Sequence, residues 1–359
     1  AIKWFKLAAD DLSVKAQNHL AVMFDDKEGI IDRYTDAVNW NMLEAAKGNN
    51  KAQFNLGVMY KNGFGVIKDY EVAEKWYALA AENGNTNAQN IVKQYPHPIE
   101  LENDNVYLNL GIKHENNYSD KDSRLFEMMK WYALAAAQGN AQAQYNLGHM
   151  FDIWCEAIEL LEDNKYIEKW YTLAAENGNA DAKYGLAYLY EEEYGITGDY
   201  ETAVKWYMLA AEQGHNQAQF DLGEMYRDGF GVEKNHETFV KWLTLAAENG
   251  NIEAQNNLAY MYAEGEGVEQ DYTTAVKLWR LAAREGDSIA QLNLAKSYLF
   301  GRGVKGDDIH ALMWAQLAAS SKWNSEAADL KKYMEEKMTS EEISKSKEIA
   351  LKYDKKKLN

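Results

Sequence analysis

The feature that most constrains this chain is an internal repeat whose copies are marked by tryptophan, most often at intervals of 36 residues. The copies carry Trp4, Trp40, Trp76, Trp131, Trp170, Trp206, Trp242 and Trp314, and Leu278 takes the equivalent place in one copy. A repeat array grows by stacking copies on one continuous core, so a length of 359 residues does not imply two or three separate domains. The fold therefore depends on what one copy forms.

Each tryptophan lies in a segment that predicts an amphipathic helix. The pattern A-x-x-W-Y-x-L-A-A-x-x-G, complete at 203–214, places apolar residues three and four positions apart and therefore on one helical face. We call this segment the second helix of the repeat. In the copy at 203–214 we expect Trp206, Leu209 and Ala210 to pack in the core.

A first helix precedes it, with the pattern A-Q-x-N-L-G-x-M-Y at 52–60, 143–151, 218–226, 254–262 and 290–298. Its Ala, Leu and Tyr recur every four residues, which again predicts one buried face. Small residues follow the motif Leu at Gly57, Gly148, Gly223 and Ala259, and they predict close approach of a neighbouring helix.

The two helices are joined by G-x-G-V, a turn in which glycine can end a helix with positive φ. An acidic or amide residue then predicts the N-cap of the second helix at Asp69, Asp199, Asn235, Asp271 and Asp307. The link to the next first helix is only a few residues long, as at 250–254, which forces antiparallel neighbours. One such pair cannot bury enough surface alone, so the copies must stack into a solenoid.

Together these motifs resemble the Sel-one-like repeat family, relatives of tetratricopeptide repeats with a longer loop inside each helix pair. The resemblance covers nearly the whole chain. It implies an all-α fold, a right-handed α-solenoid of about eight to nine 36-residue antiparallel helix pairs with a C-terminal helical cap. It also implies a non-enzymatic scaffold or adaptor that binds a protein or peptide in a concave groove lined by the first helices.

We expect the array to occupy 1–321, with an insertion near 88–105 and a modified loop at 152–165. The insertion contains Pro96 and Pro98, and the first helix of its copy is predicted at 106–113. It is either a binding loop or a tolerated excursion. The modified loop is predicted to be helical, and Trp154 either packs on its own helix or forms an exposed patch. Residues 322–359 predict capping helices, with a capping box at Thr339 and Glu342.

Charge and motif content exclude several function classes. The net charge of −18 opposes binding to nucleic acid or to an anionic membrane surface, and the chain has no apolar run long enough to insert into a membrane. The single cysteine, Cys155, excludes an intrachain disulfide and a multi-cysteine zinc site. We find no catalytic motif, and therefore predict no catalytic residues, cofactor, metal or small-molecule substrate. The Asn117-Tyr118-Ser119 sequon carries no weight without secretion.

Partner-binding residues are predicted at positions two, three and six after the motif Ala, which point away from the buried face. The asparagines at position three either clamp a peptide backbone or bond within their own repeat, whereas the aromatic residues vary between copies and suit an interface. The candidates are Phe54, Asn55, Val58, Tyr145, Asn146, His149, Tyr184, Tyr188, Phe220, Asp221, Glu224, Asn257, Tyr260 and Asn293.

Two alternative functions remain open at this stage. Within the interaction class, the chain could be an immunity or inhibitor protein that neutralises a cognate toxin. In a different class, cysteine-rich relatives have been linked to β-lactam binding or hydrolysis, but this chain lacks their regular cysteine pairs. The chain begins at Ala1 inside a repeat, so we expect the natural protein to start further upstream. Bacterial cytoplasmic and exported locations are both compatible with it.

Overall fold

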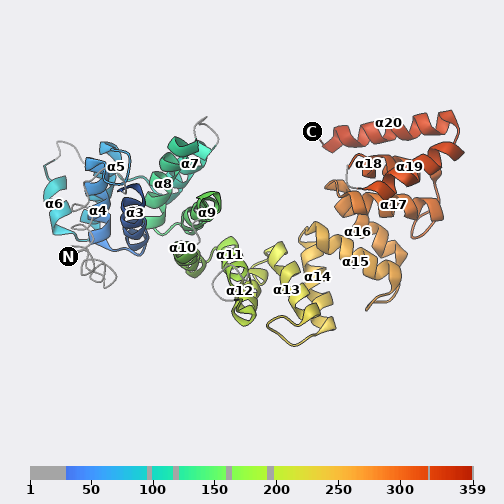
Figure 1. Ribbon diagram of the computed structural model, residues 1–359, viewed down its shortest axis with the longest axis horizontal. Helices are drawn as coiled ribbons and strands as arrows, with labels where there is room; N and C mark the ends of the chain where they lie inside the picture. Colours follow the sequence, from blue (N-terminus) through green and yellow to red (C-terminus); the bar gives the residue numbers. More distant parts are fainter. Residues whose placement is uncertain are drawn as a thin grey trace. The chain divides into compact units, whose positions relative to one another are not determined.

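The computed structural model is helical throughout the part that it describes, residues 30–94, 99–115, 121–158, 164–191, 198–321 and 324–357 (Figure 1). These residues form eighteen helices, α3 to α20, and no strand. The chain divides into two compact units, Ala1–Leu189 (unit 1) and Tyr190–Asn359 (unit 2). These units do not correspond to the predicted division into a repeat array at 1–321 and capping helices at 322–359, which was based on the repeat motifs. That division stays a prediction.

Most consecutive helices pack as neighbours, as the short links predict. Unit 1 contains α3 (Ile30–Ala46), α4 (Asn50–Asn62), α5 (Tyr70–Glu82), α6 (Thr86–Val92), α7 (Asp104–Glu115), α8 (Lys121–Ala137), α9 (Ala141–Ile158) and α10 (Asn164–Glu176). The unit boundary falls within α11 (Ala180–Glu191). Unit 2 continues with α12 (Tyr200–Ala211), α13 (Asn216–Asp228), α14 (His236–Glu248), α15 (Ile252–Glu264), α16 (Tyr272–Arg284), α17 (Ser288–Phe300), α18 (Asp308–Ala318), α19 (Ser325–Lys337) and α20 (Ser340–Lys357). Helix α4 packs with α5 and α13 with α14, for example, whereas α19 and α20 both pack on α18.

Local interactions end these helices where the sequence predicts. Asp69 caps α5, because its Oδ1 accepts the backbone N–H of Val72 at 3.1 Å, and all four other predicted N-caps make the equivalent bond. Gly63, at the C-terminus of α4, has φ of 76°, and its N–H donates to the carbonyl of Met59. The helix pair is therefore encoded within each copy.

Three of the seven repeat tryptophans in the described part of the chain are buried, Trp76, Trp170 and Trp314, and one prediction of a core residue, Leu209, is wrong. Trp76 and Trp170 are fully buried, and Ala210 is buried as expected. Trp206 is only partly buried, and Leu209 is 43% exposed. Leu209 lies at the edge of the apolar face of its helix, where a side chain is buried only if a neighbouring helix covers it. Its 43% exposure shows that no neighbouring helix covers it fully.

Small residues on the first helices allow close packing in unit 1. A Cβ added to Gly57 would lie 2.6 Å from Cδ1 and Cε1 of Tyr77, a residue that is 2% exposed. In unit 2 the equivalent Gly223 is less crowded, since an added Cβ would lie 3.5 Å from Cβ of Trp242. The predicted close approach is therefore tightest where tyrosine follows the repeat tryptophan.

Buried glutamines connect three first helices, α4, α9 and α13, to the helices before and after them. The Gln219 side-chain amide donates to the carbonyl of Ala211 at 2.9 Å, and its Oε1 accepts an N–H of Asn249 at 2.9 Å. Gln53 and Gln144 make the same pair of bonds. At Gln255 the donor is replaced by Glu285, and the buried Oε1 of Gln255 has no hydrogen bond.

Unit 1 departs from nearest-neighbour stacking. Helix α3 contacts α8 and α10 as well as α4, so residues far apart in sequence share one core. Lys130 of α8 forms an ion pair with Asp69 at 2.8 Å. Burial raises the pKa of Asp69, but the hydrogen bonds and charge of Lys130 and the N–H of Val72 outweigh it and leave the pKa lowered.

The interruptions and the C-terminus form helices as predicted. The insertion contributes α6, which ends before the prolines, and the predicted first helix at 106–113 lies within α7. Helix α9 continues to Ile158, into the modified loop predicted at 152–165, of which residues 159–163 lie outside the described part of the chain. In the capping box, the N–H of Thr339 donates to Glu342 Oε2 at 2.9 Å, and the N–H of Glu342 donates to Thr339 Oγ1 at 3.3 Å.

Several predictions lie outside the described part of the chain. They concern the first copy at 1–29, residues 95–98 with both prolines, the sequon at 117–119, and Lys322 in place of the turn glycine. The side chains of Trp154 and Cys155 are also outside it.

Candidate functional site

The predicted partner-binding residues do not all reach the surface. Asn55 is 5% exposed and donates to Oδ1 of Asn41, in the preceding helix, at 3.1 Å. Phe220 is 9% exposed and belongs to a core cluster with Phe239 and Leu243. These two side chains expose little surface, because positions two and three lie at the margin of the buried face, and their role in binding a partner stays a prediction.

In unit 1, the remaining candidates pack partly on the second helices. Phe54 lies 5.5 Å from Tyr77 between ring centroids, and Val58 is half-buried. Tyr145 of α9 is stacked between His149, at 5.8 Å, and Tyr171 of α10, at 5.6 Å. His149 is exposed, Tyr145 is half-buried and Tyr171 is buried, so the stack runs from the surface into the core and presents the imidazole of His149 at its outer end.

The two candidates on α11 differ in exposure. Tyr184 is half-buried, whereas Tyr188 is 47% exposed. Tyr188 stands six residues after the motif Ala182, the same position as His149. This position therefore carries an exposed ring in two successive copies of unit 1.

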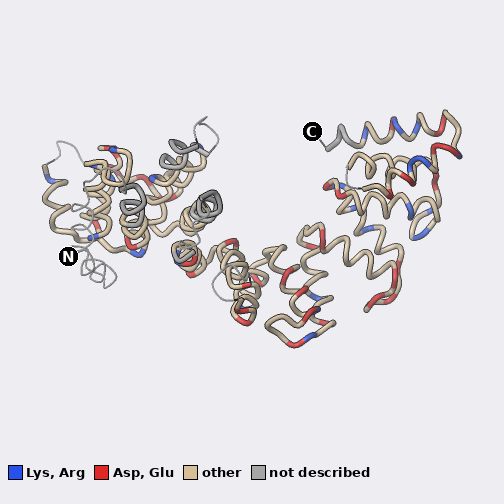
Figure 2. The backbone as a smooth tube through the Cα atoms, viewed as in Figure 1, with Lys and Arg blue, Asp and Glu red and all other residues tan. Residues whose placement is uncertain are grey.

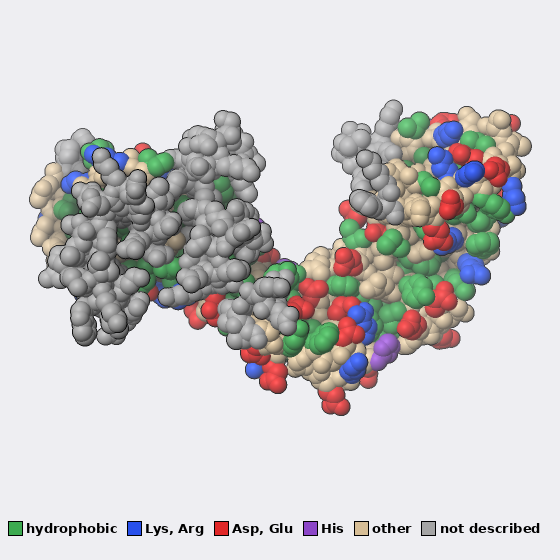
Figure 3. Space-filling model, viewed as in Figure 1, with side chains coloured by type: hydrophobic (Ala, Val, Ile, Leu, Met, Phe, Trp, Pro, Cys, Tyr) green, Lys and Arg blue, Asp and Glu red, His purple; other side chains and the backbone are tan. Residues whose placement is uncertain are grey.

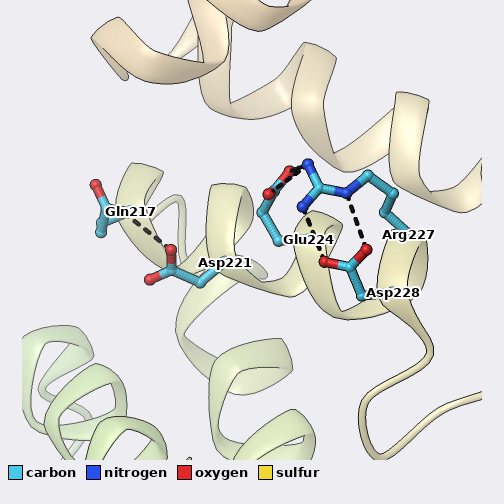
Figure 4. A network of polar contacts seen from close by, with 5 residues as sticks. All are labelled: Gln217, Asp221, Glu224, Arg227 and Asp228. Atoms are coloured by element: carbon cyan, nitrogen blue, oxygen red, sulfur yellow. Dashed lines mark hydrogen bonds and ion pairs between the residues drawn. The ribbon is translucent and has the colours of Figure 1, made fainter.

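In unit 2, α13 carries a network of charged groups (Figure 4). The Arg227 guanidinium lies between two carboxylates, donating to Glu224 at 2.7 Å and to both oxygens of Asp228 at 3.1 and 2.8 Å. Burial raises the pKa of Glu224, and the nearby charges of Asp228 and Glu253 add to this effect against the lowering by Arg227. The negative charge on this helix is thus only partly neutralised.

On the following first helix, Tyr260 takes the position of Glu224. Tyr260 is 55% exposed, among the most exposed aromatic side chains in the described part of the chain. Asn257 and Asn293 are half-buried at position three of α15 and α17. At position six, α17 has Lys296, which forms an ion pair with Glu326 of α19 at 2.7 Å. Position six therefore changes chemistry with every copy.

A polar relay that no sequence motif predicted holds the side chain at position three. In unit 1, Asn179 donates to Gln142 at 3.1 Å, and Gln142 donates to Asn146 at 2.9 Å. In unit 2, the corresponding bonds run from Asn251 to Gln217 and from Gln217 to Asp221, at 2.9 and 3.0 Å. A signal was available in the sequence, since a polar residue precedes the motif Ala in both copies.

These bonds bear on the two interpretations of position three. Asn146 and Asp221 each accept from a glutamine of their own helix, and the donor of that glutamine is the N-cap of the next first helix. In these copies position three is therefore oriented by the repeats themselves.

Neither a metal site nor a membrane span emerges from the described residues. They contain no cluster of three or more His, Cys, Asp or Glu that could hold a metal ion. None of their helices combines the length and the apolar character that crossing a bilayer requires.

Comparison with known proteins identifies the family. The Sel1 repeat model matches residues 1–11, 50–85, 129–140, 141–153, 168–179, 180–215, 216–251, 252–287 and 288–322, which is more than half of the chain. The chain belongs to the Sel1 repeat family. The Sel1 matches at 50, 180, 216, 252 and 288 begin at the first residues of first helices α4, α11, α13, α15 and α17. The matches leave three stretches between repeats unmatched, 12–49, 86–128 and 154–167. The second overlaps the predicted insertion, and the third overlaps the predicted modified loop.

Solved structures support the same fold. A protective antigen of uropathogenic Escherichia coli strains, which displays an SLR fold, is 29% identical and matches over 98% of this chain and 78% of its own, with a TM-score of 0.57. A Sel1 repeat protein from Oxalobacter formigenes is 28% identical, with 93% and 90% covered and a TM-score of 0.56. No curated protein matches the chain.

Sel1 repeat proteins typically act as non-enzymatic scaffolds that mediate interactions between proteins. An immunity protein from Pseudomonas aeruginosa is also similar, at 17% identity over 66% of this chain and 84% of its own, but its TM-score of 0.38 is too low to support the immunity alternative.

Proposed function

We propose that this protein is a non-enzymatic scaffold that binds a protein or peptide through the outward residues of its first helices. We call the surface formed by position six after the motif Ala, together with the outward residues one helical turn away, the first-helix face of each unit. The single observation that supports the proposal is the contrast within one helix. The motif Ala and Leu are buried on α4, α9, α11, α13, α15 and α17, whereas position six holds exposed Tyr188 in unit 1 and exposed Tyr260 in unit 2.

Exposed tyrosines at this position suit an interface for a physical reason. A tyrosine ring supplies a large contact area with few rotatable bonds and a hydroxyl that can bond to a partner, so aromatic residues are frequent among the side chains that dominate binding energy. Neither tyrosine is needed to fill the core of its unit, because each has about half of its surface exposed. Different side chains at position six would then determine which partner is recognised.

The proposal is tested by affinity capture with the full chain, followed by mass spectrometry. We expect one partner in stoichiometric amount, with capture reduced by roughly tenfold in Tyr188→Ala or Tyr260→Ala. Phe230→Ala is a matched control, because Phe230 is 49% exposed but lies in a loop, stacked on Tyr200. If both tyrosine variants retain the partner as well as wild type does, or if the control loses it equally, the first-helix face is not the binding surface.

A further inference from the structure

A cavity of about 230 Å³ lies in the last part of unit 2, where the end of α16, the start of α17, the end of α18 and α20 meet. This volume is many times that of one water, about 30 Å³ in the liquid, but below the roughly 300 to 1,000 Å³ of pockets for drug-sized ligands. The cavity therefore suits a group about the size of one amino-acid side chain. Its lining includes Ala283, Ser288, Gln291, Ser321 and Tyr353.

Gln291 brings a buried hydrogen-bond acceptor to this cavity. The side chain is 7% exposed, and its Nε2 donates to the carbonyl of Ala283 at 3.3 Å. Its Oε1 accepts no hydrogen bond from any residue in the described part of the chain. A buried amide oxygen without a donor costs free energy, so a ligand that donates to it would gain that free energy on binding.

The equivalent glutamine in an earlier copy shows which group fits this acceptor. In the copy formed by α13 and α14, Oε1 of Gln219 accepts Nδ2 of Asn249 at 2.9 Å. Asn216 in turn donates to the backbone carbonyl of Asn249 at 3.1 Å. Helices α4 and α5 form the same two bonds in unit 1. The group that these glutamines bind inside the protein is therefore the carboxamide of an asparagine.

The last copy lacks both of these asparagines. Ser288 stands where Asn216 stands two copies earlier, and Ser321 stands where Asn249 stands. Helix α18 also ends early, because its C-cap is Ala319, whereas the C-cap of α14 is Asn249 itself. Two shorter side chains and an earlier helix end leave room beside the glutamine of this copy.

The surroundings of the cavity favour an uncharged ligand. None of the described residues that line it is charged. Helix α18 holds one acidic residue, Asp308, and no lysine or arginine, so the backbone view shows most of it as uncharged (Figure 2). Charged side chains do lie over the visible outer surface of unit 2 (Figure 3). Burying an unpaired charge costs far more than burying a neutral amide, so a carboxamide fits this lining better than an ion does.

We infer that this cavity binds the side-chain carboxamide of an asparagine or glutamine that a protein partner presents. The amide N–H donates to Oε1 of Gln291, as the internal asparagines do, and the hydroxyls of Ser288 and Ser321 are potential donors to the amide oxygen. The ring of Tyr353, edge-on to Trp314 at 5.0 Å between centroids, forms an apolar wall. That the carboxamide belongs to a protein rests on the proposed function, but no lining residue belongs to the first-helix face.

Binding is tested with propanamide, a small primary amide, titrated into the isotope-labelled full chain and followed by NMR. We expect saturable chemical-shift changes at the backbone amides of Ser288, Gln291 and Ser321. The dissociation constant should be in the millimolar range, because a ligand this small supplies little binding energy. Two matched ligands are the controls: N,N-dimethylpropanamide has no N–H to donate, and propanoate carries a charge. Both should bind more weakly than propanamide by roughly fivefold or more.

Three variants test the geometry. Ser321→Asn supplies the carboxamide from the chain itself, as Asn249 does in the earlier copy, so it should abolish the propanamide shifts and raise the unfolding midpoint of unit 2. Gln291→Leu keeps the volume but removes the acceptor, and should weaken propanamide binding by roughly fivefold. Gln255→Leu is the matched control, because Gln255 makes the same bond to its preceding helix and also has an Oε1 without a hydrogen bond, but does not line the cavity. It should change propanamide binding by less than about twofold.

The source of the carboxamide is tested by partner capture with the full chain, after circular dichroism has confirmed that each variant keeps its helices. Ser321→Asn should reduce capture several-fold, and Gln255→Leu should not. The inference is wrong if propanamide does not bind the wild-type chain, if Gln291→Leu and Gln255→Leu weaken its binding equally, or if Ser321→Asn captures the partner as well as wild type. Each of these results leaves the proposed function standing, because that function is tested by the dependence of capture on Tyr188 and Tyr260. Capture that does not depend on those tyrosines refutes the proposed function and leaves the propanamide titration unaffected.

Discussion

Replacing Gly57 by alanine tests how closely α4 and α5 must approach. The added Cβ would lie 2.6 Å from two ring carbons of Tyr77, well inside van der Waals contact. Tyr77 cannot easily move, because it is 2% exposed and packs against Phe54. Overpacking of this kind costs about 1 to 3 kcal/mol, whereas alanine in place of glycine inside a helix returns about 1 kcal/mol. We expect a net loss of up to about 2 kcal/mol in the stability of unit 1.

Gly223→Ala is the matched control in unit 2. Its added Cβ would make ordinary contacts, at 3.5 Å from Trp242 and 3.6 Å from Phe239. The gain in helix propensity should therefore prevail, and we expect unit 2 to become more stable by up to about 1 kcal/mol. Leu243 stands in this copy where Tyr77 stands in the other. The difference between the two substitutions should thus follow from the tyrosine ring.

The assay is hydrogen exchange with mass spectrometry during thermal or urea unfolding, since it reports on α4 and α5 separately from α13 and α14. The double variant Gly57→Ala with Tyr77→Leu should recover part of the lost stability relative to Tyr77→Leu alone, which makes the coupling between the two sites measurable. Equal effects of Gly57→Ala and Gly223→Ala, or no coupling to Tyr77, would refute the steric argument.

Three further predictions concern polar contacts. Asp69→Asn keeps an N-cap but removes the ion pair to Lys130, and we expect a loss of about 1 to 2 kcal/mol at neutral pH. Because the folded-state pKa of Asp69 is lowered, this difference should begin to shrink below about pH 4 and disappear only once the pH is below that folded-state pKa, as urea titrations at several pH values would measure. Glu285→Asn should supply the hydrogen-bond donor that Gln255 Oε1 lacks and raise the free energy of unfolding by about 1 kcal/mol. Glu285→Ala should raise it less, because that substitution only removes a negative charge at the C-terminus of α16. Equal gains for the two variants in urea unfolding would contradict the role of the missing hydrogen bond. His215→Asn should stabilise α13, and by more at acidic pH. The reason is that Nδ1 of His215 accepts the backbone N–H of Ala218 at the N-cap and must be unprotonated to do so. An effect on hydrogen exchange in α13 that does not change with pH would argue against this capping role.

Much of the candidate face could be located from the sequence, but its individual members could not. The helical period places position six on the surface, and Tyr188 and Tyr260 are exposed there. The same reasoning placed Asn55 and Phe220 on the surface, and both are buried. Positions two and three lie at the edge of the buried face, where burial depends on the size and place of a neighbouring helix. The polar relay through Gln142 and Gln217 was missed for the same reason, since its donors belong to the next copy.

Features that depend on residues close together in the chain could be predicted from the sequence. Helix periods, the N-cap at Asp69, the turn at Gly63 and the capping box at Thr339 each involve interactions across a few residues, and repetition of the motifs made them unmistakable. The residues that lie across from each helix face, in contrast, depend on the packing of whole helices. It left Leu209 exposed, brought α3 against α8 and α10, and placed Lys130 beside an aspartate 61 residues away, because contacts between copies depend on how whole helices pack and no local pattern encodes that packing.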